Sequence, residues 1–247
     1  MDPNRRAGVA AGVLFIVATV ADLISRALVQ PVLGAQDYLV RVSANEGQVL
    51  LGALFLVIGA VAAAAIAIAL YPVLRKHNEA LALGSVGFRL IEGGLYLGIV
   101  VCLLLLVALS RESESAGAAA LSARDVAGTL LMAGRDALGE VAVLAFGLGA
   151  LMYYGVFYRT RLLPRWLSAW GILAIVLVMA SGVLVMLRLV EPMSTTQIVL
   201  AAPIGLQEMV LAIWLIAKGF KPVAVVSAPA IATAPASATA LAGPQTL

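Results

Sequence analysis

The stretch ALALGSVGFRLIEGGLYLGIVVCLLLLVAL, residues 80–109, carries two charged side chains, Arg89 and Glu92, in an otherwise apolar or small-residue run. A helix needs about 20 mainly apolar residues to cross the hydrocarbon core of a bilayer. Each charged group within that core costs at least ~2.5–3.5 kcal/mol, so such groups face other helices and find partners there. The stretch therefore predicts a membrane-spanning helix with one polar face inside a bundle.

The composition of the whole chain agrees with a lipid bilayer as its environment. Of the 247 residues, 63% are hydrophobic and 12% are charged, whereas soluble domains carry about a quarter charged residues. With one cysteine, Cys102, and one histidine, His77, the chain lacks the parts for an internal disulfide, a histidine or thiolate metal cluster, or a Ser-His-Asp triad. We expect no cofactor and no metal.

Six segments are long and apolar enough to span the membrane. We predict an all-α, polytopic six-helix transmembrane bundle over residues 1–221, with helices at about 7–29, 47–71, 80–109, 125–158, 166–188 and 197–217. The first segment is interpreted as a span rather than a cleaved signal peptide, because its apolar run reaches about twenty residues. Ser194 or Thr195 is expected to cap the last helix.

Basic residues cluster in every second gap between these segments and predict the topology. Short loops rich in lysine and arginine remain in the cytoplasm, which predicts that both termini are cytoplasmic and that the protein lies in the cytoplasmic (inner) membrane of the cell. Residues 222–247 are rich in Ala, Pro, Ser and Thr and predict a disordered cytoplasmic tail. The basic clusters comprise Arg5, Arg6, Arg75, Lys76, Arg159, Arg161, Arg165, Lys218 and Lys221.

Further charged residues fall inside the predicted spans and define a candidate site. A rise of about 1.5 Å per residue puts most of them near the middle of a core about 30 Å thick. Residues three and four apart share a helix face, which groups Arg89 and Glu92 with Ser85 and Tyr96. The predicted buried polar cluster is Arg89, Glu92, Tyr96, Arg135, Asp136, Glu140 and Glu208, with Asp22 and Arg26 as a secondary pair.

The predicted spans hold five acids against three arginines. Two uncompensated negative charges in a low-dielectric interior are unfavourable, so the excess predicts a bound cation, protonation of one or two acids, or access of water. The opposing hypothesis is that the Arg–acid pairs only hold helices in register. Nearer the predicted cytoplasmic side, an aromatic belt is expected from Tyr153, Tyr154, Tyr158, Trp166 and Trp170.

Three motifs resemble a bacterial membrane family catalogued as domain of unknown function 4386. They are YRTRLLPRWLSAWGILAIV (158–176), QEMVLAIWLIAKGF (207–220) and FRLIE (88–92). The resemblance covers about residues 7–221 and implies a six-helix integral membrane protein, with no established reaction, substrate or cofactor. The residues that match these motifs are Arg89, Glu92, Pro164, Arg165, Glu208, Trp214, Lys218 and Gly219.

Three classes of function compete. The first is a bundle that binds or translocates a small polar solute, a cation or a proton through the charged cluster. The second is a structural, sensory or assembly protein in which the cluster locks helix packing. The third is an intramembrane enzyme using Asp136 and Glu140 as bases or metal ligands, although no motif with diagnostic spacing favours it. The sequence shows no Gly-rich phosphate loop, and its basic residues flank helices, which disfavours nucleotide and nucleic-acid partners. It does not specify an oligomeric state.

Overall fold

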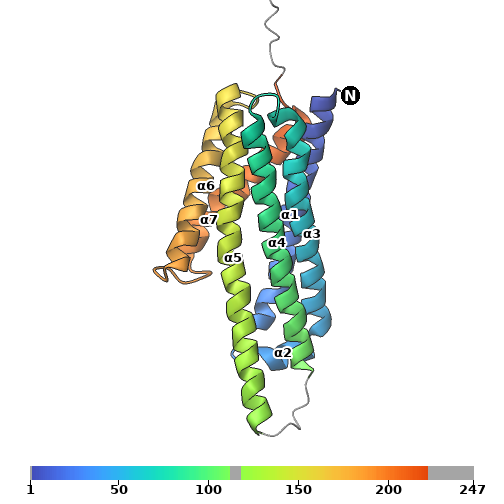
Figure 1. Ribbon diagram of the computed structural model, residues 1–247, viewed down its shortest axis with the longest axis vertical. Coiled ribbons are helices and arrows are strands. Elements are labelled where there is room, and N and C mark those ends of the chain that lie inside the picture. Colours follow the sequence, from blue (N-terminus) through green and yellow to red (C-terminus); the bar gives the residue numbers. More distant parts are fainter. Residues whose placement is uncertain (1, 112–117, 222–247) are drawn as a thin grey trace, which may run out of the picture.

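The computed structural model describes residues 2–111 and 118–221, which are helical apart from short connections. Six helices in this part of the chain are long and apolar enough to cross a membrane (Figure 1). The predicted all-α, six-span bundle is therefore confirmed. The spanning helices are α1 (Pro3–Leu33), α3 (Glu46–Leu74), α4 (Glu79–Ser110), α5 (Ala118–Thr160), α6 (Arg165–Met186) and α7 (Thr195–Ala217). The tail predicted for residues 222–247 lies outside the described residues.

A short helix between the first two spans was not predicted. α2 (Tyr38–Ala44) has seven residues and buries Leu39 and Val42 against α1, α3 and α4. α5 also begins at Ala118 rather than near residue 125, and has 43 residues. Hydropathy detects the part of a helix that suits lipid, so polar helical turns beyond it give no signal. The predicted cap is confirmed, since the Ser194 hydroxyl accepts a hydrogen bond from the Gln197 amide at 3.4 Å.

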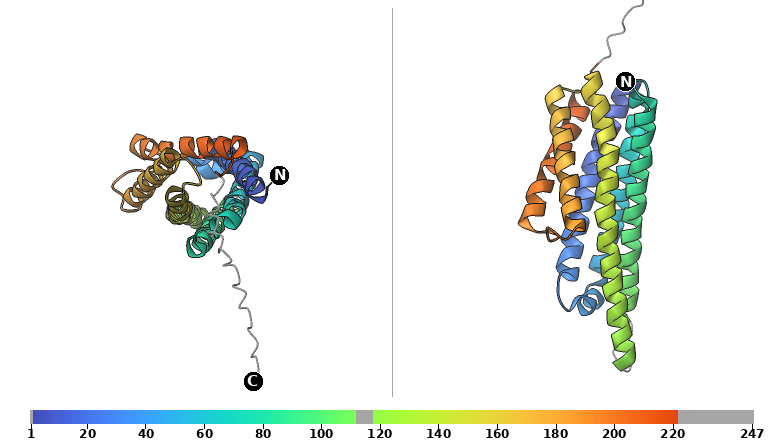
Figure 2. Two further views of the ribbon diagram at one scale, coloured as in Figure 1. Left: turned by 90° about the horizontal axis from the view of Figure 1, so that it is seen from above. Right: turned by 60° about the vertical axis from the view of Figure 1, so that its left-hand side comes forward.

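The six spanning helices form a closed ring in which each packs mainly on two neighbours. The order around the ring follows the chain, α1–α3–α4–α5–α6–α7, and α7 packs back on α1 (Figure 2, left). Short connections account for this order, because they place consecutive helices antiparallel and side by side. A ring of six helices leaves an interior that side chains from all of them can reach.

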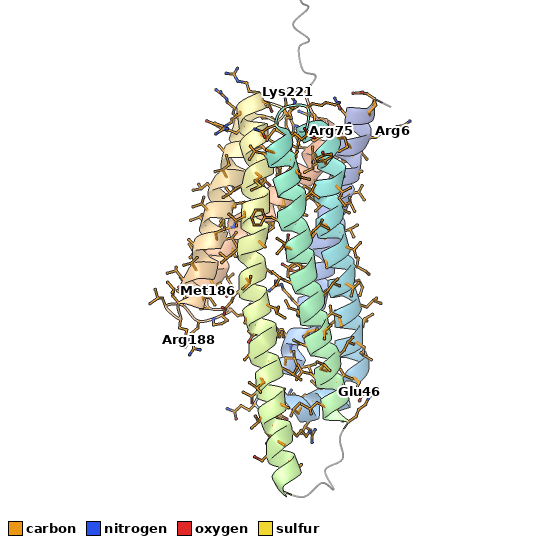
Figure 3. All side chains as sticks on the ribbon, in the orientation of Figure 1. Arg6, Glu46, Arg75, Met186, Arg188 and Lys221 are labelled. Atoms are coloured by element: carbon orange, nitrogen blue, oxygen red, sulfur yellow. The ribbon has the colours of Figure 1, made fainter. Side chains whose placement is uncertain are left out.

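The end of the ring that holds the chain's N-terminus is tightly packed. Phe15, Tyr153, Tyr154 and Phe157 pack ring against ring here, with centroid distances of 4.7 to 6.5 Å. Arg6, Arg75 and Lys221 lie at this end, while Glu46 lies at the other (Figure 3). We call these the basic end and the α2 end. The structure thus brings charge clusters from distant loops to one end of the bundle.

Arg5 closes the ring at the basic end by capping α7. Its guanidinium donates hydrogen bonds to the carbonyl oxygens of Leu215 at 2.7 Å, Ile216 at 2.5 Å and Ala217 at 3.2 Å. The last carbonyls of a helix lack partners within it and carry partial negative charge, so a cation there is stabilising. The same seam is close-packed, because a Cβ on Gly12 would meet the Ala212 carbonyl oxygen at 2.7 Å.

α6 and α7 end well short of the α2 end. They have 22 and 23 residues, and their connection lies part-way along α5, near Met186 and Arg188 in Figure 3. Gly182 of α6 faces Val143 of α5, where an added Cβ would lie 3.0 Å from Val143 Cγ1. Because the two helices run antiparallel, the end of α6 at Met186 is level with Gly139 and Glu140. The first turns of α5 therefore project past two of the six spans.

We expect Arg5→Gln to weaken the α1–α7 seam, because three carbonyl groups lose a charged donor. The melting temperature in detergent should fall, corresponding to a loss of about 1–2 kcal/mol. Arg6→Gln is the matched control, since it removes the same charge from an exposed neighbour. Equal melting temperatures for the two variants would contradict the capping role.

Candidate functional site

The ring encloses a cavity of about 480 Å³ in its interior. We call it the central cavity. Most of its lining is apolar, and its polar side chains come from four helices of the ring: α1, α4, α6 and α7. It opens between α1 and the first half of α7, where the exposed side chains of Leu23 and Ile198 line it. Its charged residues are Asp22, Arg26, Arg89, Glu92 and Glu208.

Arg89 and Glu92 form a buried ion pair on the cavity wall. Arg89 Nη1 lies 3.0 Å from Glu92 Oε2, and the two residues are 2% and 3% exposed. Arg89 Nε also donates to the Ala63 carbonyl oxygen of α3 at 3.2 Å, and its guanidinium lies 5.0 Å from the ring centroid of Phe146 on α5. One side chain of α4 therefore contacts both neighbouring helices. Ser85, also buried, shares its face as predicted.

Several buried polar atoms at this site have no hydrogen-bond partner within the described residues. Although Arg89 Nη1 and Glu92 Oε2 are in ion-pair contact, the angles between them are not those of a hydrogen bond. Glu208 Oε1, on the same cavity lining, is also buried without a partner, as is the Tyr153 hydroxyl, which does not line the cavity. Buried polar groups are normally hydrogen-bonded. The three such atoms on the cavity lining, from Arg89, Glu92 and Glu208, indicate room for a ligand or water that completes their bonds.

Asp22 and Arg26 stand between the central cavity and a second hollow. They form an ion pair of 2.7 Å on successive turns of α1, and both line each of the two spaces. Tyr96 and Gln197 also line both. The predicted secondary pair is thus placed at the junction, where its side chains are partly exposed. The two spaces therefore adjoin along this shared wall.

The second hollow, of about 360 Å³, lies beneath the α6–α7 connection and is called the outer groove. Arg135, Asp136 and Glu140 line this groove and not the central cavity. Arg135 lies 3.5 Å from Asp136 and donates to the Gln30 side chain at 3.5 Å. Their side chains are 20% exposed for Arg135 and 52% for Asp136.

The structure therefore divides the predicted cluster between two places. Arg89, Glu92, Tyr96 and Glu208 come together at the central cavity, while Arg135, Asp136 and Glu140 lie toward the α2 end. Arg135 and Asp136 are past the level where α6 ends, and not level with Glu208. The difference arises because the sequence predicts that this span starts near residue 125, whereas α5 begins at Ala118 and projects beyond its shorter neighbours.

Two tyrosines predicted for an aromatic belt belong to the core instead. Tyr153 and Tyr154 are 0% exposed, so this part of the prediction is wrong, whereas Tyr158 and Trp166 are exposed. The Tyr154 hydroxyl donates to the Gln207 side chain at 2.5 Å, and Gln207 donates to the Leu167 carbonyl at 3.2 Å. This buried network joins α5, α6 and α7. The feature of the sequence that indicates this network is a polar amide, Gln207, next to Glu208 in an otherwise apolar run.

The chemistry of the cavity suits binding. Among the described residues, no three His, Cys, Asp or Glu side chains converge in a way that could hold a metal ion. The lining combines apolar surface with a few converging polar groups, which is the composition of small-molecule sites.

The fold and the cavity define a class, that of multi-pass helical membrane proteins with a polar site inside the ring. Residues 10–219 match the family described as Domain of unknown function (DUF4386), and the chain belongs to that family. Neither the curated proteins nor the solved structures gave a match to this chain. The family thus agrees with the resemblance of the three motifs and assigns no activity.

We expect Arg89→Met alone to destabilise the bundle by about 3–5 kcal/mol, because it leaves Glu92 buried without a partner. The double variant Arg89→Met/Glu92→Leu should recover most of this loss, since an apolar pair of similar volume is often as stable as a buried ion pair. Thermal unfolding in one detergent measures all three proteins. A double variant as unstable as the single one would contradict this account of the pair.

Proposed function

We propose that the protein binds, and moves across the membrane, a small solute held in the central cavity. The observation that carries the proposal is the group of buried polar atoms without hydrogen-bond partners around a cavity of about 480 Å³. A solute with polar groups would satisfy these atoms while its apolar parts contact the remaining wall. Ionisable residues that face a cavity inside a membrane bundle typically mark such pathways.

The unequal packing of the two ends supports this proposal. At the basic end the cavity is closed by the aromatic cluster of Phe15, Tyr153, Tyr154 and Phe157. Toward the α2 end it adjoins the outer groove at Asp22 and Arg26, which line both spaces. A site that is closed toward one face and bordered by a hollow on the other side suits one of the two states that alternating access requires.

We propose further that the basic end faces the cytoplasm of a bacterial cell. Basic residues from the N-terminus, the α3–α4 and α5–α6 connections and the end of α7 gather there (Figure 3). Loops of this composition are retained on the cytoplasmic side. In this orientation the outer groove opens to the opposite side of the inner membrane.

Reporter fusions test the orientation. Alkaline phosphatase fused after Lys221 should be inactive and green fluorescent protein fluorescent, while fusions after Val190, between α6 and α7, should show the reverse. Alkaline phosphatase activity at Lys221 together with fluorescence at Val190 would invert the proposed topology.

A second candidate function is supported by the contacts of Arg89. Because this side chain joins α4 to Ala63 of α3 and Phe146 of α5, the ion pair could serve solely to lock three helices together. The protein would then act through its surfaces, as a structural or sensory component. The two candidates differ in one measurable property: the transport candidate requires the central cavity to be accessible to water-soluble compounds.

Cysteine labelling distinguishes these candidates. Gly205 lines the central cavity, and a Cβ there would meet no atom within 4 Å. In a Cys102→Ala background, we expect Gly205→Cys to react with a charged, membrane-impermeant methanethiosulfonate added from the α2 side. Mass spectrometry of the intact protein measures the extent of reaction.

Gly94→Cys is the matched control. Gly94 is exposed on α4, two residues from Glu92, has equally free space for a side chain, and does not line either hollow. A cysteine at position 94 therefore faces lipid. We expect it not to react, because the charged reagent does not enter the hydrocarbon core and a thiol does not ionise there. Equal failure of both cysteines to react would reject an accessible cavity and leave the locking role.

A further inference from the structure

Glu208 is the charged residue of the central cavity that has no ion-pair partner within the described residues. The other four charges are paired, Asp22 with Arg26 at 2.7 Å and Glu92 with Arg89 at 3.0 Å. Glu208 Oε1 is buried and accepts no hydrogen bond there. A carboxyl group in this situation either takes up a proton or faces a cation, because an isolated buried carboxylate is strongly unfavourable.

The remainder of the lining favours an organic cation over a small inorganic one. Three aromatic rings line the cavity, those of Phe15, Tyr96 and Phe146, from three different helices. Aromatic faces attract ammonium groups, most strongly when the site excludes water. A bare metal ion would instead need several oxygen ligands at short range, and the described part of the chain brings no three acidic side chains together in that way.

The volume and the opening limit the cation further. A cavity of about 480 Å³ holds a molecule of roughly drug-fragment size. The opening between α1 and α7 is lined by Leu23 and Ile198, so an apolar portion of the ligand can enter along lipid-facing surface. Phe15 and the aromatic cluster above it close the far side.

We propose that the central cavity binds a monovalent ammonium compound with an apolar body, its charge facing Glu208 and the aromatic rings and its body against the remaining apolar lining. This assignment rests on the proposed function and names the chemical class of its solute. The Arg89–Glu92 pair lines the same cavity without adding net charge. The single unpaired carboxylate of Glu208 therefore matches the single positive charge of the ligand.

The test compares three probes of similar shape and different charge. Benzyltrimethylammonium is the cation, neopentylbenzene is its neutral isostere, and phenylacetate is an aromatic anion. We expect the purified full-length protein in nanodiscs to bind the cation at least about tenfold more tightly than either other probe, because it alone gains the attraction of the carboxylate and the aromatic faces. Protection of Gly205→Cys from methanethiosulfonate measures binding of all three at the cavity itself.

Glu208→Gln should weaken binding of the cation by about tenfold or more while leaving the neutral probe unchanged. Glu79→Gln is the charge-matched control, because Glu79 is exposed at the basic end and lines neither hollow. Thermal unfolding verifies that each variant is folded. If Glu208→Gln does not fold, the comparison of the cation with its neutral isostere on the Gly205→Cys protein that retains Glu208 tests the assignment.

The outcomes separate this inference from the function on which it rests. Equal protection by cation and isostere, preference for the anion, or undiminished cation binding by Glu208→Gln overturns the ammonium assignment. So does the absence of protection by every probe when Gly205→Cys reacts readily, although an accessible cavity then stands. Failure of Gly205→Cys to react at all contradicts the cavity-based function itself.

Nanodiscs of two compositions distinguish a free ammonium compound from a lipid headgroup of the same chemistry. If the natural occupant is a choline headgroup, phosphatidylcholine should lower the apparent affinity for benzyltrimethylammonium relative to phosphatidylglycerol alone. Equal affinity in the two lipids indicates a free compound. Either result supports an ammonium site.

Discussion

The contacts of the Arg89 guanidinium organise the interior of this bundle. A charge of this kind is costly within lipid, and the structure offsets that cost by giving it an anion, a carbonyl and an aromatic face. These come from Glu92 on the same helix, Ala63 on α3 and Phe146 on α5. Since the three partners lie on three consecutive members of the ring, satisfying one charge also sets how these helices meet.

The wall of the central cavity next to Arg89 includes a close seam between α3 and α4. Arg89 and Glu92 occupy the wall together, and Gly93 brings the neighbouring helix close, since an added Cβ would meet the Ala60 carbonyl at 3.2 Å. Gly94 makes no such approach. The same cavity is also lined by α1 and α7, which contribute Asp22, Arg26 and Glu208.

Unequal helix lengths make the two ends of the bundle different. All six spans meet at the basic end, where aromatic rings and the Arg5 cap close the interior. Toward the α2 end, α6 and α7 stop early and leave the outer groove beneath their connection. Arg135 and Asp136 of this groove are paired with each other and partly exposed, so they need less compensation than Arg89 and Glu92 do.

The sequence by itself determined the class of fold, the number of spans, the polar face of α4 and the gathering of basic residues at alternate gaps. These depend on hydropathy and on the helical period, which are local properties of the chain. It also singled out Glu208 and the Arg89–Glu92 pair, because charge in an apolar run is conspicuous. α2 and the true start of α5 escaped detection, because lipid does not select for helix outside the hydrocarbon core.

Only the tertiary structure decided which charged residues share a cavity. Arg135, Asp136 and Glu140 looked equivalent to Glu208 along the chain, yet the register of α5 against the shorter α6 places them in the outer groove. Tyr153 and Tyr154 looked like interfacial residues and proved to be core. Which residues of different helices meet depends on helix lengths, tilts and side-chain packing between segments far apart in sequence, and no local pattern encodes that sum of contacts.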